Sequence, residues 1–284
     1  MNRLLLLSAA LLMAAGPAHA QRRPAPAPAA SQPGPGDWRT PDPQNVLVIE
    51  TNRGRILLEL NPRLAPAHVE RVRELARQGF YDGRKFFRVI DGFMAQTGDP
   101  QDTGEGGSTL PDLGPEFKLR LAPAEMGKVA SDAVSETGFV GPNPVRSQNA
   151  WMAVATVDGK VSAYGLYCPG VAGMARGSAE NSANSQFFLM RDTYAALEQR
   201  YTVFGRVLSG LDVVRAIKTG EPVTPPQDAM TRVRVLADTP EAERPKVRVV
   251  DAASPWLQAE AARQKALRGI AFNACDIELP VEVK

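Results

Sequence analysis

The sequence predicts a mainly β protein built around a closed antiparallel barrel at residues 44–237. Three observations favour this fold class: many short runs rich in β-branched and aromatic residues, few stretches with helical periodicity, and frequent glycine and proline residues between the runs. The chain has 284 residues and 44% of them are apolar, so a sizeable core can form.

The first elements of the barrel are expected to be a β-hairpin and a helix. Residues 46–51 and 55–60 are rich in aliphatic side chains, and the sequence Asn-Arg-Gly at 52–54 suits a tight turn between them. From Pro66 to Gln78 the apolar side chains recur on one helical face, so this stretch is predicted to be an amphipathic helix. His68 lies in its first turn, where we expect a solvated rather than a catalytic side chain.

The other barrel strands are predicted from short apolar runs spread over the rest of the domain. These runs lie at residues 86–90, 93–96, 171–174, 185–190, 202–207 and 231–236. Residues 211–217 are predicted to form a short second helix. The glycine-rich loop at residues 103–108 lacks the Gly-Lys-Ser/Thr ending of a phosphate-binding loop, so a nucleotide site is not expected there.

An insertion at about residues 118–168 interrupts the barrel pattern. Within it, residues 151–157 and 161–166 are expected to pair as a hairpin around an Asp-Gly-Lys turn. The rest of the insertion, including residues 138–146, is predicted to be loop.

A C-terminal extension follows the barrel at residues 238–284. Ser254 is a candidate helix cap with Pro255 in the first helical position, and Gly269 lies just past the expected end of that helix. Residues 275–283 are expected to add a strand. The extension is predicted to pack on the barrel as support, with a contact surface as the alternative.

The N-terminal segments predict export. Residues 1–20 combine an early arginine, an uncharged apolar stretch and an Ala-His-Ala site, which is typical of a secretory signal peptide. Residues 21–43 are dominated by proline, alanine, glycine and serine, which indicates a linker. No later stretch is long enough to span a membrane. We therefore expect a protein of the periplasm after removal of the signal peptide.

Charge and histidine content exclude several function classes. Lys and Arg total 33 against 31 Asp and Glu, a formal charge of +2, which is too balanced for nucleic-acid binding. Only two histidines are present, and His19 lies in the predicted signal peptide, so His68 alone would remain. A zinc site rich in histidine and most histidine-based triads are therefore excluded, and neither a metal nor a cofactor is expected.

Two cysteines, Cys168 and Cys275, are present. An oxidising compartment would allow them to form a disulfide, and two separately buried thiols are the alternative.

Several motifs, in order along the chain, resemble those of the cyclophilin family. They are Phe86–Gln96 (FFRVIDGFMAQ), Gly98-Asp99, Gly106-Gly107, Gly173–Ala175, Asn184–Phe188 and Val203–Gly205. The resemblance covers about residues 45–237 without the insertion. It implies an eight-stranded closed barrel capped by two helices, and an enzyme that catalyses cis–trans isomerisation of the peptide bond preceding proline.

The chemistry of this reaction agrees with the residue inventory. Rotation about the X-Pro bond breaks no covalent bond, so it requires no nucleophile, metal or cofactor; the obstacle is amide resonance, a barrier of about 18–20 kcal/mol. Twisting the bond localises the lone pair on the prolyl nitrogen, and a donor aimed at that nitrogen stabilises the twisted state. The resemblance implies that Arg88 is this donor and that Gln96 holds Arg88 and the substrate carbonyl.

The resemblance also implies an apolar pocket for the proline ring and contacts to the rest of the peptide. The pocket residues would be Phe93, Met94, Phe188 and Leu197. Beside the pocket, Gln186 would lie close to Gln96, and Ala175 would offer main-chain contacts.

Three positions depart from the pattern of the family. Tyr201 stands where many members have a histidine lining the pocket, and Arg176 stands where the best-known members have an asparagine that binds the peptide through its backbone. Ala196 stands where the best-known members have a tryptophan that contributes to cyclosporin binding, so strong inhibition by cyclosporin is not implied.

The expected partners are proline-containing peptides and unfolded or folding exported proteins. The alternative function is a cyclophilin-like chaperone or peptide-binding module with little isomerase activity, in which the insertion covers the groove as a lid or serves as a docking surface. A hydrolase is disfavoured because Ser162 and Ser185 lack a histidine in a recognisable nucleophile motif.

Overall fold

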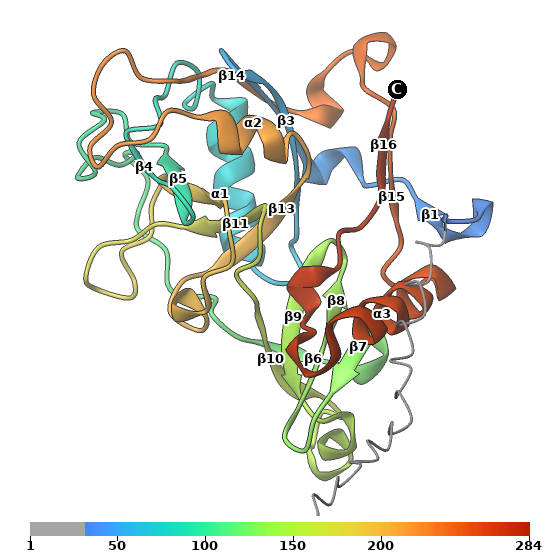
Figure 1. Ribbon diagram of the computed structural model, residues 1–284. Helices are drawn as coiled ribbons and strands as arrows, with labels where there is room; N and C mark the ends of the chain where they lie inside the picture. Colours follow the sequence, from blue (N-terminus) through green and yellow to red (C-terminus); the bar gives the residue numbers. More distant parts are fainter. Residues whose placement is uncertain (1–31) are drawn as a thin grey trace, which may run out of the picture.

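The computed structural model describes residues 32–284 of the chain. The signal peptide predicted at residues 1–20 and the first part of the linker predicted at residues 21–43 lie outside the described residues. The described chain forms an eight-stranded sheet, a five-stranded sheet and a three-stranded sheet (Figure 1). Within residues 32–284, no helix has the length and apolar character that crossing a membrane requires.

The eight-stranded sheet is antiparallel throughout and confirms the mainly β fold. In spatial order its strands are β14 (Met230–Val235), β2 (Val46–Thr51), β3 (Gly54–Leu60), β13 (Val203–Ser209), β11 (Val171–Met174), β12 (Phe187–Met190), β5 (Met94–Thr97) and β4 (Arg88–Ile90). The predicted hairpin is confirmed as β2 and β3, and each later run predicted as a strand contains or overlaps one of these strands.

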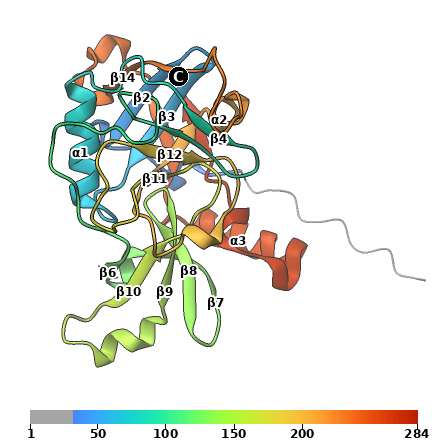
Figure 2. The same ribbon diagram turned by 90° about the vertical axis from the view of Figure 1, so that its left-hand side faces the viewer.

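Two helices pack on the curled sheet, as the resemblance implies (Figure 2). α1 (Pro66–Arg77) lies against β13 and β14, and α2 (Leu211–Ala216) lies against β3. The apolar face of α1 is fully buried and includes Val69, Val72 and Leu75, so the predicted amphipathic helix is confirmed.

The eight-stranded sheet curls but is not closed by continuous strand pairing, because β14 and β4 remain its two edges. The loop at residues 217–229 lies beside β4 instead. Val89 and Gly220 exchange two backbone hydrogen bonds of 2.8 Å, and the amide of Phe86 donates to the carbonyl of Asp228 at 2.9 Å. A closed barrel would require β14 to pair with β4, but this loop occupies that edge of β4. The prediction of a closed barrel is therefore wrong, and the sheet is curled with two edges.

His68 is completely buried, so the expectation of a solvated side chain is wrong. Its Nδ1 lies 2.6 Å from a carboxylate oxygen of Glu116, which also accepts hydrogen bonds from the backbone amides of Ala67 and His68. Burial opposes the charge of Glu116, but these hydrogen bonds outweigh it and lower the pKa of the carboxyl group. A carboxylate at the amino end of α1 is favoured by the helix dipole, and it gives the histidine a partner away from water.

The insertion folds as a five-stranded antiparallel sheet. In spatial order its strands are β6 (Leu119–Leu121), β10 (Val161–Gly165), β9 (Asn143–Gln148), β8 (Ser135–Val140) and β7 (Gly127–Ser131). Residues 138–146 are therefore mostly strand, and the prediction of a loop there is wrong. Residues 151–157 do not pair with β10, because Ala150–Ala155 form a 3-10 helix, η4, so the predicted hairpin is also wrong. Most of β8 is buried on both faces, which removes the polar–apolar alternation that would have marked it as a strand.

The extension packs against the insertion as well as the barrel (Figure 1). α3 (Pro255–Arg268) begins after Ser254 and ends before Gly269, as predicted, and it lies on β7. β15 (Val247–Val250) pairs with β16 (Val281–Val283), so the strand predicted at residues 275–283 is present only at its end.

Short 3-10 helices connect many of these elements. Besides η4 they are η1 (Pro35–Asp37), η2 (Pro43–Asn45), η3 (Pro123–Glu125), η5 (Ala195–Leu197), η6 (Leu236–Asp238), η7 (Glu241–Glu243), η8 (Gly269–Ala271) and η9 (Ala274–Asp276).

The last part of the predicted linker has regular structure. β1 (Trp38–Arg39) pairs with β15, and the guanidinium of Arg248 lies 4.4 Å from the centre of the Trp38 ring. The backbone carbonyl of Asp37 accepts from the amide of Asp251, just before α3. The extension therefore supplies partners for a segment whose composition alone indicates no fold.

A disulfide joins Cys168 to Cys275, with 5.1 Å between their Cα atoms. Of the two alternatives for the cysteines, the bonded one is confirmed. The bridge connects the residues just before β11 with the extension across a sequence separation of 107 residues.

The buried apolar residues form two clusters. One fills the inside of the curled sheet and includes Ile49, Phe187 and Leu189. The other lies on the outer face of β5 and β12, where it includes Met94 and Phe188, and it continues through the insertion and the extension. The residues predicted to bind proline therefore share a core with the insertion.

Candidate active site

Strand register brings the predicted catalytic residues into one row. Arg88 on β4 lies opposite Gln96 on β5, and Gln96 lies opposite Phe188 on β12. Residues directly opposite each other in antiparallel strands point to the same face of the sheet. Met94, two residues before Gln96, points to that face as well, so a guanidinium, an amide and two apolar side chains share the outer surface.

Arg88 is held by two acceptors. Its Nη1 donates to Oε1 of Gln96 at 3.3 Å, and its Nε donates to Oε1 of Glu221 at 2.6 Å. The Arg88 side chain is 37% exposed, so it is accessible at the surface while its position is defined.

Gln96 and Gln186 form the next link of this hydrogen-bond chain. Nε2 of Gln96 donates to Oε1 of Gln186 at 2.9 Å. Nε2 of Gln186 in turn donates to the carbonyls of Gly104 and Gly106, at 2.9 and 2.7 Å. The glycine-rich loop at residues 103–108 is thus one wall of the site.

Asp99 organises this glycine-rich loop. Its buried carboxylate accepts from the backbone amides of Gln101, Thr103, Gly104 and Gly106. Burial opposes the charge of Asp99, but these hydrogen bonds outweigh it and place the pKa of the carboxyl group below its usual range. A Cβ atom on Gly106 would come within 1.9 Å of the carboxylate, so the close approach requires glycine.

The apolar pocket residues lie together beside Arg88 and Gln96. Met94, Phe188 and Leu197 are buried, and Phe93 is partly buried, with its ring 4.4 Å from that of Tyr194. Met94, Phe188 and Leu197 belong to one buried hydrophobic cluster, and Phe93 packs against it.

Two tyrosine rings contact the ring of Phe188, one on its face and one at its edge. Tyr167 stacks on it with 5.8 Å between ring centres, and Tyr201 meets it edge-on at 6.0 Å. A Cβ on Gly173 would come within 2.5 Å of the Phe188 ring, so glycine makes room for the aromatic side chain. Tyr201 is therefore in contact with one of the residues predicted to form the proline pocket.

Arg176 does not project its charge freely into the groove. Its guanidinium lies over the Tyr201 ring, 4.7 Å from its centre, and donates to the carbonyls of Arg200, Gly177 and Ser178. Arg176 therefore packs on the ring of Tyr201 and also lines the cavity beside Gln96 and Gln186.

A cavity of about 550 Å³ adjoins the row formed by Arg88, Gln96 and Phe188. It is lined by Gln96, Gln186, Ala175 and Arg176 together with the glycine-rich loop, and no residue of the insertion lines it. The amide of Ala175 donates to the carbonyl of Gln186, so a main-chain contact to a peptide would fall to the Ala175 carbonyl.

Comparison with known proteins identifies the family. A model of the family described as "Cyclophilin type peptidyl-prolyl cis-trans isomerase/CLD" matches residues 46–237. The chain belongs to this family. As a cyclophilin it falls in an enzyme class, the peptidyl-prolyl cis-trans isomerases.

Relatives of this cyclophilin occur in bacteria and in animals. A "Probable peptidyl-prolyl cis-trans isomerase" of Brucella suis biovar 1 is 37% identical over 190 residues, which cover 63% of this chain and 74% of the relative. "Peptidyl-prolyl cis-trans isomerase-like 1" of Homo sapiens is 35% identical over 154 residues, which cover 54% and 87% of the two chains.

A solved structure resembles more than the cyclophilin domain. The crystal structure of cyclophilin AquaCyp293 from Hirschia baltica has a TM-score of 0.80 and 33% identity, and the match covers 88% of this chain and 94% of the other. This coverage exceeds the stretch that the family model matches, so the likeness includes parts outside residues 46–237.

Several residues around the site of this cyclophilin were not singled out from the sequence. They are Glu221, which accepts from Arg88, and Tyr167, which supports Phe188. Asp99, which shapes the loop, stands in the Gly98-Asp99 motif, but nothing in the local pattern marks Glu221 or Tyr167, because both reach the site only through the tertiary fold.

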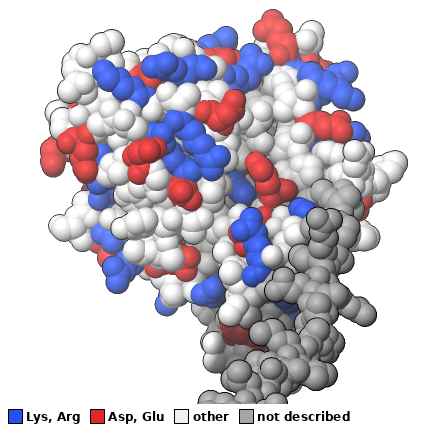
Figure 3. All heavy atoms as spheres, viewed as in Figure 1, with Lys and Arg blue, Asp and Glu red and all other residues white. Residues whose placement is uncertain are grey.

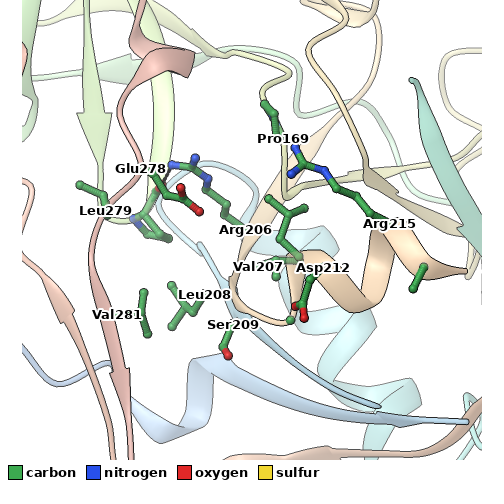
Figure 4. A pocket seen from close by; sticks show the side chains of 14 residues that line it. Pro169, Arg206, Val207, Leu208, Ser209, Asp212, Arg215, Glu278, Leu279 and Val281 are labelled. Atoms are coloured by element: carbon green, nitrogen blue, oxygen red, sulfur yellow. Dashed lines mark hydrogen bonds between the residues drawn. The ribbon is translucent and has the colours of Figure 1, made fainter. Parts of the chain in front are cut away.

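A separate cavity of about 650 Å³ lies between β13, α2 and the extension (Figure 4). Arg206 and Glu278 lie close together in it, and burial lowers the pKa of Arg206 to about 10, opposed by the charge of Glu278. None of the residues predicted for the site of the cyclophilin lines this cavity.

Acidic and basic side chains are interspersed on the face of this cyclophilin that Figure 3 shows, so that face carries no large patch of one charge. Within residues 32–284, no group of three or more His, Cys, Asp or Glu side chains is arranged to hold a metal ion.

Proposed function

We propose that the protein accelerates rotation about X-Pro bonds by donating a hydrogen bond from Arg88 to the prolyl nitrogen. The observation that carries this proposal is the shared face on which Arg88 and Gln96 lie beside the pocket residues Met94 and Phe188. A proline ring seated against these apolar side chains would bring its nitrogen to the edge of the pocket, where the guanidinium lies.

The energetic effect of one such hydrogen bond is substantial. Twisting the amide develops a lone pair on nitrogen, which the planar ground states lack, so the donor stabilises the transition state selectively. A hydrogen bond involving a charged group contributes about 1.5–3 kcal/mol, which corresponds to about tenfold to hundredfold in rate. The apolar pocket would contribute further by fixing the ring and excluding water.

Gln96 would have two roles in this mechanism. Its Oε1 accepts from Arg88 and so keeps the guanidinium beside the pocket, while its amide is linked to Gln186. Because Gln186 is tied to the glycine-rich loop, the polar wall is held in place before substrate arrives.

We propose further that the clients are exported proteins and that the protein acts in the periplasm. The disulfide between Cys168 and Cys275 supports an oxidising compartment. Uncatalysed isomerisation takes tens of seconds or longer, so acceleration would help exported chains fold.

A protease-coupled assay on a peptide with one X-Pro bond tests the activity. The residues 21–284 should raise the rate of cis-to-trans conversion above the uncatalysed rate in proportion to protein concentration. A rate that does not depend on protein concentration would refute the proposed activity.

A docking role for the insertion is the second candidate function. Trp151, Val154 and Val157 are exposed to 69%, 92% and 110%. Trp151 and Val154 are three residues apart in η4, so they lie on one side of this 3-10 helix, and Val157 follows just beyond its end; we call these three residues the ridge. Such an exposed apolar ridge favours contact with an unfolded client.

Replacing the ridge residues together by serine separates the two functions. If the ridge binds clients, the triple variant should isomerise a short peptide at the normal rate but accelerate refolding of a proline-limited protein less than the wild type does. Equal acceleration of refolding by both proteins would exclude the docking role.

A further inference from the structure

The backbone places Glu221 directly beside Arg88. Gly220 exchanges two hydrogen bonds with Val89, and the amide of Val223 donates to the carbonyl of Phe87 at 2.8 Å. The neighbours of Glu221 are thus paired with the neighbours of Arg88. The position of the carboxylate beside the guanidinium follows from main-chain pairing and not from a chance contact between two long side chains.

The loop that carries Glu221 is fastened at its two ends. Asp228 is buried and accepts from the amide of Lys218 at 2.8 Å, and the Lys218 ammonium donates to the carbonyl of Thr224 at 2.7 Å. A Cβ on Gly220 would lie 2.7 Å from the Cα of Val223, so the loop is also tightly packed on itself.

The contacts of Arg88 divide its donors into two groups. A guanidinium has five N–H groups in a rigid plane. Nε donates to Glu221, in the loop at residues 217–229, and Nη1 donates to Gln96, on β5. These two acceptors together define the orientation of the guanidinium plane. Within residues 32–284 the other N–H groups on the terminal nitrogens have no acceptor, so they are available to a substrate.

The ion pair is too exposed to serve mainly for stability. The side chains of Arg88 and Glu221 are 37% and 56% exposed, and pairs of this kind contribute little to folding. A flexible arginine without a second acceptor would sample many rotamers, and only a few would aim it at the pocket.

We infer that Glu221 is a positioning residue that orients the Arg88 guanidinium toward the prolyl nitrogen. This inference rests on the proposed function, since it concerns the orientation of the same donor. Gln96 alone would leave the guanidinium free to rotate about one hydrogen bond, whereas the carboxylate at Nε fixes the plane. Glu221 acts through Arg88 and does not need to touch the substrate.

The test is a double-mutant cycle with the full mature chain. Glu221→Gln removes the charge and keeps the size of the side chain, and it should lower kcat/KM about threefold to tenfold, mainly through kcat. In the Arg88→Ala background the same change should have no further effect. Glu50→Gln is the matched control, because Glu50 pairs with Arg55 at 2.7 Å on another part of the sheet.

A second measurement keeps the test independent of residual activity. The Nε–Hε order parameter of Arg88, measured by NMR, should be high in the wild type and in Glu50→Gln, and should fall below about 0.6 in Glu221→Gln. Glu221→Asp should restore part of the order and part of kcat.

The outcomes distinguish this inference from the proposed function. Normal kcat and an ordered Arg88 in Glu221→Gln would overturn the inference alone, as would an equal loss in both backgrounds. A wild-type protein without isomerase activity would overturn the proposed function, and with it the inference.

Discussion

Loss of the disulfide between Cys168 and Cys275 should destabilise the protein strongly. The bridge closes a loop of 107 residues and ties the extension to the segment that leads into β11. Opening it restores conformational freedom to the unfolded chain, so the folded state becomes less favoured.

The chain-entropy relation gives the magnitude. For a loop of this length the expected stabilisation is about 5 kcal/mol at 25 °C, which corresponds to a fall in Tm of about 10–20 °C for a protein of this size. Cys168 is fully buried against the cluster that contains Phe188, so local disruption would add to the entropic effect.

Denaturant unfolding with and without dithiothreitol measures the difference. The wild type should lose stability when reduced, whereas Cys168→Ala/Cys275→Ala should unfold at the same denaturant concentration under both conditions. A reduced wild type that retains its free energy of unfolding to within about 1 kcal/mol of the oxidised form would show that the bridge does not stabilise the fold in this way.

Further predictions concern the pocket, the loop and pH. Phe188→Ala should cost about 3–5 kcal/mol in unfolding free energy and lower peptide turnover, measured by denaturation and by the coupled assay. Gly106→Ala should reduce turnover severalfold, because its Cβ meets the carboxylate of Asp99, whereas Gly114→Ala, with no atom within 4 Å of the added Cβ, should not. Glu116→Gln should destabilise at neutral pH. Since the folded state lowers the pKa of Glu116, this contribution is present above about pH 4.5 and is lost as the pH falls, so the two proteins should converge in acid. A difference in unfolding free energy that persists unchanged at low pH would contradict this assignment.

The barrel strands and α1 could be predicted because each pattern is local. The stretch from Pro66 buries one helical face and exposes the other, so its periodicity reports its environment, and the run around Phe86–Gln96 is marked as strand by its β-branched and aromatic residues. The residues of the site followed from motif order, and strand register then brought Arg88, Gln96 and Phe188 into one row.

The insertion could not be predicted in the same way. β8 is buried between the barrel, the extension and neighbouring strands, and its sequence therefore lacks the alternation of a half-buried strand. Closure of the barrel was overestimated because the loop near Gly220 takes the pairing edge of β4, which no local signal indicates.

Hydrogen bonds between polar residues far apart in the sequence could not be predicted from local patterns either. The position of His68 in the first turn of a helix predicts a solvated side chain, and no local pattern indicates its burial because its partner, Glu116, lies 48 residues away. Glu221 is 133 residues from Arg88, and nothing in the intervening sequence relates the two.

The assignment of Arg88 as the donor is tested by NMR measurement of the exchange rate of a peptide with one X-Pro bond in the presence of wild type, Arg88→Ala and Arg55→Ala. Arg55 forms an ion pair of similar exposure elsewhere on the sheet, so it controls for loss of a surface charge. We expect Arg88→Ala to lower catalysed exchange about tenfold to hundredfold with an unchanged Tm, and Arg55→Ala to have no effect. Full activity in a folded Arg88→Ala variant would contradict the assignment of the guanidinium as the donor.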